Sequence, residues 1–132
     1  MEVLSSRVLL RPHDFEASLR FYTEVIGLRV YREYGAGGRV TGTVLFLGGG
    51  FLELLAQPGD HRGPLGAGDV SLWLQVPDVD AEHERLAGLG VTVVAPPETK
   101  PWGLRECWVA DPDGLALVLV EVPEDHPLRR RL

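Results

Sequence analysis

An internal repeat limits the folds open to this chain more than its composition does. Asp14 opens an amphipathic stretch over residues 14–28, and Asp78 opens a similar stretch over residues 78–91. Each Asp side chain can cap the free amides at the start of a helix. A Gly follows the apolar stripe in both copies, where a helix would end in a left-handed residue. We therefore expect the same helical unit in each half of the chain.

Candidate strands surround both helices in the same order, as runs of apolar and β-branched residues bounded by Gly-rich turns. In the first half these strands are expected at residues 3–11, 28–34, 40–47 and 51–56. In the second half they are expected at residues 70–76, 91–95, 105–110 and 115–122. The predicted fold class is α+β, with a strand, a helix and three strands in each of two βαβββ modules.

We expect one domain over residues 1–132, because a chain of this length can bury a proper hydrophobic core. Module one covers about 1–57, and a linker rich in Gly and Pro covers 58–69. Module two covers about 70–122, and residues 123–132 form a C-terminal tail. A single module would leave its apolar surface half exposed, so the two modules should pack together or against a partner chain.

Charge and cysteine content narrow the possible partners. The net charge of −6 argues against nucleic acid and anionic membranes, and Arg129–Arg131 is interpreted as a solvated tail. No apolar run approaches the roughly 18 residues of a membrane helix. Cys107 is the one cysteine, which excludes an internal disulfide and indicates a reducing compartment, so we expect a cytoplasmic protein. It has no basic neighbour in a motif and should be an inert strand residue.

The order and spacing of these motifs resemble the glyoxalase, bleomycin-resistance and dioxygenase superfamily, also called the vicinal oxygen chelate superfamily. Residues 14–28, which read DFEASLRFYTEVIGL, are similar to its first helix. The stretch 101–106, leading to Asp-Pro-Asp-Gly at 111–114, looks like its bleomycin-resistance-type branch. The resemblance covers roughly residues 5–121. It implies that each sheet curves into a half-barrel around a ligand cleft, and that two chains form a homodimer.

The resemblance also identifies where metal-using members of the family hold their ion. Their usual ligands are His or Gln, Glu, His and Glu, and the matching positions here are Arg7, Glu53, Ser71 and Val118. An Arg does not lose its proton to coordinate a metal, and a Val has no donor atom. Glu121 cannot replace Val118, because three residues along a strand reverse the face. We expect no metal and no other cofactor.

Strand alternation extends this set to a predicted lining of the cleft. Arg7 and Glu53 should form an ion pair where a metal would bind, because an isolated buried carboxylate is strongly penalised. The alternative is that Glu53 faces a wet cleft without a partner. The predicted ligand-binding residues are Arg7, Leu9, Phe51, Glu53, Leu55, Ser71, Trp73, Gln75, Trp102 and Val118.

Two tryptophans are harder to place from the sequence. Trp102 stands on a Pro- and Gly-flanked loop, where it could stack on a planar or cationic ligand or anchor the loop in the fold. Trp108 is expected in the core, although the phase of its strand is not fixed by the sequence. The resulting cleft would be apolar and aromatic with a few polar groups, the usual composition of a small-molecule site.

These features favour a metal-independent binder of a small organic molecule, similar to proteins that confer resistance by sequestering an antibiotic. The acidic charge would attract a cationic drug. The alternative is a metal-independent lyase, isomerase or cyclase-like enzyme, with Glu53 as general acid or base and Arg7 holding an oxyanion. A third class is an interaction module whose cavity is filled by side chains. The fold alone does not choose among them.

Overall fold

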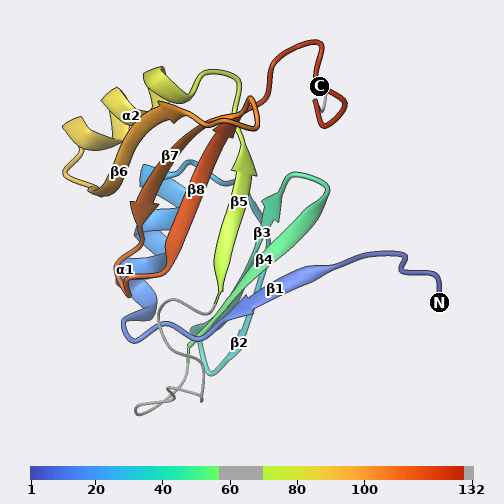
Figure 1. Cartoon of the computed structure of the whole chain (residues 1–132). Coiled ribbons are helices and arrows are strands. Elements are labelled where there is room, and N and C mark those ends of the chain that lie inside the picture. The colour runs from blue at the N-terminus through green and yellow to red at the C-terminus, as the bar shows by residue number, and fades with distance from the viewer. Residues whose placement is uncertain (57–69, 130–132) are drawn as a thin grey trace. The chain divides into compact units, whose positions relative to one another are not determined.

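The computed structural model describes residues 1–56 and 70–129. The chain divides into two compact units, Met1–Pro64 and Leu65–Leu132, which contain module one and module two. The predicted linker at 58–69 lies outside the described residues. Both modules have the expected order of elements (Figure 1), so the α+β class with two βαβββ modules is confirmed. That both modules form one domain stays a prediction.

Module one has a four-stranded mixed sheet. Its elements are β1 (Arg7–Leu10), α1 (Phe15–Arg20), η1 (Phe21–Val25), β2 (Val30–Ala36), β3 (Arg39–Leu47) and β4 (Gly50–Leu55). The strand order is β1-β4-β3-β2, with β1 parallel to β4 and the other pairs antiparallel. The turn between β2 and β3 is tighter than expected, because Gly37 and Gly38 alone supply the two positive φ angles it needs.

The helical segment of module one is not one regular α-helix. Asp14 caps its start as predicted, and its carboxylate accepts a hydrogen bond from the Ala17 amide at 3.0 Å. After α1 the backbone widens into η1, a π-helical segment in which the hydrogen bonds span five residues. Gly27 then ends the segment at a φ of 93°, which bears out the expected left-handed terminus.

Module two repeats this topology with a regular helix. Its elements are β5 (Ser71–Gln75), α2 (Val79–Gly88), β6 (Thr92–Thr99), β7 (Arg105–Ala110) and β8 (Ala116–Glu121). The order is β5-β8-β7-β6, with β5 parallel to β8. Asp78 caps α2 through the Ala81 amide at 3.0 Å, and Gly90 follows the helix with a φ of 82°. Among the described residues each sheet is open, with β1 and β2 at the edges of one and β5 and β6 at the edges of the other, as expected of a half-barrel and not of a closed barrel.

Two strands differ most in length from the sequence prediction. β1 begins at Arg7, where pairing with β4 begins, and not at residue 3. β6 continues past residue 95 to Thr99, because irregularities in its pairing with β7 accommodate Pro96 and Pro97, which cannot donate ladder hydrogen bonds. No helix of the described residues is long and apolar enough to cross a membrane.

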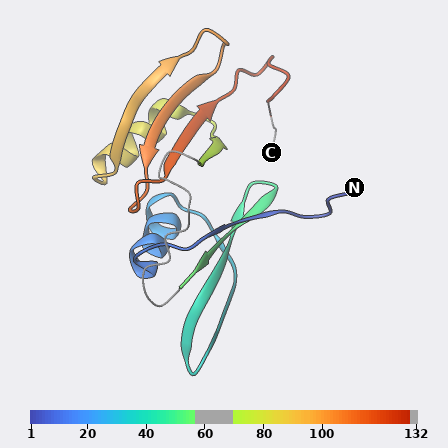
Figure 2. The same ribbon diagram turned by 60° about the horizontal axis from the view of Figure 1, so that its bottom comes forward.

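Each sheet has one face turned to its helix. In module two, α2 contacts β6, β7 and β8 and runs along one face of the sheet (Figures 1 and 2). Alternation separates the two faces: Leu72 is 6% exposed and its neighbour Trp73 is 49% exposed. In module one, Leu52 and Leu54 are fully buried, and Glu53 between them points to the other face. We call the face of each sheet opposite its buried leucines the open face.

Candidate functional site

A charged group of three residues lies on the open face of module one. The parallel pairing of β1 with β4 places Arg7 opposite Phe51, which lies two residues before Glu53 on the same face of β4. Arg7 Nη1 donates to Glu53 Oε1 at 2.5 Å, so the predicted ion pair is confirmed. The Tyr34 hydroxyl, from β2, donates to Glu53 Oε2, also at 2.5 Å. Because both carboxylate oxygens have partners, the alternative of an unpartnered Glu53 is wrong.

These two hydrogen bonds set the protonation of the group. The bond from Tyr34 and then the bond from Arg7 lower the pKa of Glu53, and together they outweigh the burial that would raise it. Burial and then the bond to Glu53 raise the pKa of Tyr34. At neutral pH Glu53 is therefore a carboxylate and Tyr34 a neutral phenol. A carboxylate held in this way is a weak general base and carries no proton to give as an acid.

Three aromatic rings adjoin the charged group on the same face. Tyr31 stacks on Phe51 with ring centroids 5.1 Å apart, and Phe46 lies 5.1 Å from Tyr31 and 5.7 Å from Phe51. The guanidinium carbon of Arg7 lies 5.7 Å from the Phe51 centroid. Tyr31 is 52% exposed and Phe46 is 40% exposed. We call Tyr31, Phe46 and Phe51 the aromatic trio, and two of its rings are exposed.

The open face of module two carries all three tryptophans of the chain. Strand register places Trp73, Val118 and Trp108 in one row across β5, β8 and β7. Trp102, from the loop before β7, donates its indole Nε1 to Glu106 Oε2 at 2.9 Å. The aromatic residues of this face are therefore all tryptophans, whereas those of the open face of module one are tyrosines and phenylalanines.

The described positions of the predicted site residues follow their strand phase. Arg7, Leu9, Phe51, Glu53 and Leu55 share the open face of module one, and Ser71, Trp73, Gln75 and Val118 share that of module two. Val118 is only 3% exposed and forms a buried cluster with Leu104, Val120 and Val122, against which Trp108 packs. Contact of these residues with a ligand, and a cleft enclosed by both modules, stay predictions.

Sequence reasoning missed several residues of these faces. Tyr31, Tyr34 and Phe46 join Glu53 through the pairing of β2 with β3 and of β3 with β4, which the sequence does not reveal. Glu106 and Trp108 share a face because two residues along a strand return to the same side. Trp108 does pack against the apolar cluster as expected of a core residue, and it also lies on the face of Trp73.

The residues at the four metal positions do not fit a divalent ion. Both oxygens of Glu53 are already held by Arg7 and Tyr34. Val118 offers no donor atom, and the guanidinium of Arg7 stays protonated. A structural or catalytic ion of this kind needs three or four protein donors. The donor set in this chain therefore rules out the arrangement that the family resemblance describes.

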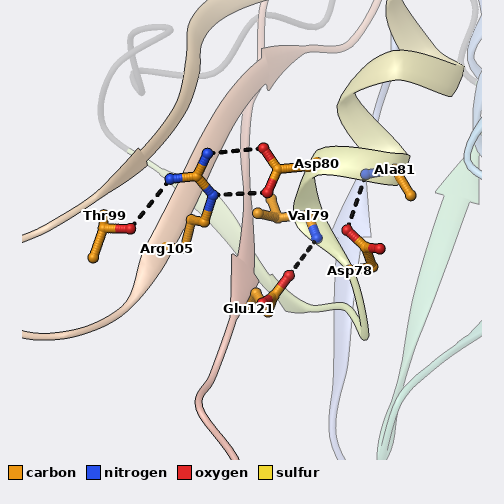
Figure 3. A network of polar contacts seen from close by, with 7 residues as sticks. All are labelled: Asp78, Val79, Asp80, Ala81, Thr99, Arg105 and Glu121. Carbon is orange, nitrogen blue, oxygen red and sulfur yellow. Dashed lines mark hydrogen bonds and ion pairs between the residues drawn. The ribbon is translucent and has the colours of Figure 1, made fainter.

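A second acidic group lies at the start of α2 (Figure 3). Carboxylate oxygens of Asp78, Asp80 and Glu121 lie within 4.8 Å of one another. Asp78 caps the helix, Glu121 accepts from the Val79 amide at 2.9 Å, and Asp80 binds Arg105 through two hydrogen bonds of 2.8 Å. The bond from Arg105 lowers the pKa of Asp80. This group holds α2 against its sheet, and it confirms that Glu121 faces away from Val118.

Two further features are a buried cysteine in module two and a surface hollow in module one. Cys107 is fully buried, and burial raises the pKa of its thiol, which agrees with the prediction of an inert residue. A surface hollow of about 360 Å³ lies at the β2–β3 hairpin, lined by residues 33–40. It shares only Tyr34 with the charged group, and three of its eight lining residues are Gly.

Comparisons with known proteins agree with the resemblance. The family model of the Glyoxalase/Bleomycin resistance protein/Dioxygenase superfamily matches residues 5–119. A probable lactoylglutathione lyase of Synechocystis sp. (strain ATCC 27184 / PCC 6803 / Kazusa) is 28% identical over 122 residues, which are 86% of this chain and 91% of that protein. The structure of TioX from Micromonospora sp. ML1 matches with a TM-score of 0.72 at 25% identity, covering 90% of this chain and 98% of its own. A superfamily member from Sphaerobacter thermophilus DSM 20745 matches with a TM-score of 0.70 at 27% identity, covering 91% and 98%.

Proposed function

The chain belongs to the glyoxalase/bleomycin resistance protein/dioxygenase superfamily, and we propose that it is a metal-independent binder of small organic molecules. One observation carries this proposal: Glu53, at a metal-ligand position of the family, is neutralised by Arg7 and hydrogen bonded by Tyr34. An internal cation thus takes the place that the family resemblance gives to a metal. Binding of a ligand at this site would then depend on the fit of its shape and on stacking against aromatic rings, and not on a metal.

The aromatic trio supports the same proposal. It places exposed ring surface next to a charged group whose charges balance, so a planar ligand could stack on Tyr31 and Phe46 without desolvating an unpaired ion. Apolar and aromatic surface with a few polar groups is typical of small-molecule sites. The ligand class that we propose is an antibiotic or another secondary metabolite, which the protein would sequester.

A metal-independent lyase or isomerase is the second candidate. The name of the Synechocystis relative, a probable lactoylglutathione lyase, favours it. In such an enzyme Glu53 would have to release Arg7 or Tyr34 to move a proton. The lowered pKa of Glu53 weakens it as a base and so favours the binder. The two functions separate in one variant, because Glu53→Gln would abolish turnover in the enzyme.

We further propose a cytoplasmic homodimer. The family resemblance implies that cavities are built from modules of two chains, and each described sheet keeps unpaired edge strands. Sedimentation equilibrium at micromolar concentration should give a species of twice the chain mass. A species of 14.5 kDa would contradict the dimer.

Native mass spectrometry of freshly purified protein tests the main proposal, because it reports bound metal and carried ligand together. We expect no stoichiometric Zn, Ni, Fe or Mn after dialysis, and about one of these ions per chain, lost on mutation of Glu53, would contradict us. A panel of aromatic antibiotics is then titrated by calorimetry. Tyr31→Ala should weaken binding by roughly 1–3 kcal/mol, the scale of a lost stacking contact. Tyr31→Phe is the matched control, because it keeps the ring.

A further inference from the structure

Glu106 is a buried carboxylate without a counter-ion in the described part of the chain. It is 8% exposed, and its Oε2 accepts a hydrogen bond from the Trp102 indole. The basic residues closest to it in sequence are engaged elsewhere: Lys100 pairs with Glu98 at 3.1 Å, and Arg105 turns to the helix side to bind Asp80. A carboxylate buried in this way is costly unless something compensates its charge.

Aromatic residues share the open face of module two with this carboxylate. Trp108 lies two residues along β7 on the same face, and Trp102 contacts Glu106 directly. Trp73 lies in the row that contains Trp108. Trp102 and Trp73 are 60% and 49% exposed, so their indole faces are accessible. Indole faces attract organic cations, and a nearby carboxylate strengthens that attraction.

From this arrangement we infer that the open face of module two binds an organic cation, with Glu106 as the counter-ion and the three tryptophans as its aromatic wall. An ammonium or protonated amine would neutralise Glu106 and stack on indole rings. The inference rests on the proposed function, since it names the ligand class: a small molecule that carries a positive charge on an apolar body. It uses residues of module two alone.

Two probes of equal shape isolate the role of charge. The first is (4-hydroxyphenyl)trimethylammonium, and the second is its uncharged isostere, 4-tert-butylphenol. Both are titrated into ¹⁵N-labelled full-length protein while the three indole N–H resonances are followed. We expect the cation to shift these resonances with an affinity at least about tenfold higher than that of the isostere. Equal affinities, or no binding of either probe up to the solubility limit of the phenol, would overturn the inference.

The key variant is Glu106→Gln, which removes the charge and keeps an oxygen that can accept from Trp102. It should lower the affinity for the cation by roughly tenfold and leave the affinity for the isostere unchanged. Glu98→Gln is the matched control: it lies opposite Glu106 on the neighbouring strand and removes the same charge from a side chain that is 68% exposed. Its effect should stay under about twofold. Equal effects of both variants would overturn the inference.

A second variant guards against loss of folding in the Glu106 variant. Trp73→Leu alters a half-exposed side chain and should fold normally. It should lower the affinity for the cation by more than the affinity for the isostere, because only the cation is attracted by the ring quadrupole. An equal loss for both probes would leave no role for charge and would contradict the inference. The Tyr31 variants distinguish failure of this inference from failure of the proposed function. If they alter antibiotic binding while cation selectivity is absent, the proposed function stands and this inference fails.

Discussion

The two modules share a topology and differ in the chemistry of their open faces. In module one the buried carboxylate Glu53 is held by Arg7 and Tyr34. In module two the buried carboxylate Glu106 has the indole of Trp102 as its one hydrogen-bond partner among the described residues. The repeated fold determines which side chains share a face, and it leaves their charge balance free to differ. The carboxylate of module one therefore has a cationic partner, whereas that of module two has none among the described residues.

The helix sides of the modules differ as well. Module two has a regular α2 whose start is fixed by three carboxylates and Arg105. In module one, α1 passes into the π-helical η1 after six residues. The aromatic residues divide in the same way, because all three tyrosines lie in module one and all three tryptophans in module two. Each module thus carries its own spectroscopic reporter, so the comparison can be tested one module at a time.

The largest effect should come from the core of module two. Leu86 on α2 is 1% exposed, and Leu86→Ala removes buried methyl groups and leaves a cavity, which should cost about 2–5 kcal/mol of unfolding free energy. Urea unfolding followed by Trp fluorescence reports this loss in module two. The ¹⁹F signals of incorporated 3-fluorotyrosine report module one in the same titration. If the fluorotyrosine transition shifts by as much as the Trp transition, the modules unfold as one unit. If the fluorotyrosine transition does not shift, the modules unfold separately.

Leu89→Ala is the control for this measurement. Leu89 follows α2 at helical spacing from Leu86, yet it is 57% exposed. Its truncation should change the unfolding free energy by less than about 0.5 kcal/mol. A loss below about 1 kcal/mol for Leu86→Ala would mean that α2 does not pack on its sheet as described.

Much of the fold could be predicted from local patterns. The caps at Asp14 and Asp78 and the glycines that end both helical segments are features of a few neighbouring residues. Strand alternation likewise placed Trp73 and Ser71 opposite Leu72, which depends on parity alone. The π-helical η1 could not be predicted, because its apolar stripe has the same spacing as that of an α-helix.

The charged group could be predicted only in part. The Arg7–Glu53 pair followed from matched positions in the family resemblance, and the geometry confirms it. Tyr34 could not be added, because its pairing with β3 is interrupted by two register shifts. Each shift changes which side chains share a face, and no local pattern reveals where it occurs.

Glu106 was missed for another reason. β7 begins with two charged residues, Arg105 and Glu106, and continues with four apolar or small ones. In such a strand the odd and the even positions each hold one charged residue followed by apolar or small ones. The sequence therefore does not show which set faces the helix. The structure resolves the phase, because Arg105 binds Asp80 on the helix side and Glu106 therefore points to the open face.

The next effect in size should come from the charged group of module one. Arg7→Met leaves the buried Glu53 carboxylate with Tyr34 as its partner, and we expect a loss of about 1–2 kcal/mol in unfolding free energy at neutral pH. The value is below that of a fully buried pair because the Arg7 side chain is 43% exposed. Arg85→Met is the matched control in module two, since the Arg85 side chain is 42% exposed and pairs with Glu82 on the helix surface. Its loss should stay under about 0.5 kcal/mol, and equal losses would show that Glu53 is not specially dependent on Arg7.

The smallest effect should come from Tyr34→Phe, and its pH dependence identifies its origin. The hydrogen bond from Tyr34 lowers the pKa of Glu53, so it stabilises the ionised form in the folded protein. Its contribution, about 0.5–1.5 kcal/mol, should be complete above the ordinary Glu pKa of about 4.3 and should disappear as the pH falls through the lower folded pKa. The folded pKa of Tyr34 is raised, so on the alkaline side the contribution should persist to about pH 10 and disappear above it.

Urea unfolding of wild type and Tyr34→Phe across this pH range should therefore give a difference that is flat at neutral pH and falls at both ends. ¹³C NMR of the Glu53 carboxyl carbon should show its pKa moving up toward the ordinary value in the variant. Tyr31→Phe removes the same hydroxyl from a residue whose ring packs against Phe46 and Phe51, and it should leave the Glu53 titration unchanged. A difference that persists unchanged below the folded pKa of Glu53 would mean that Tyr34 stabilises module one by packing and not through the carboxylate.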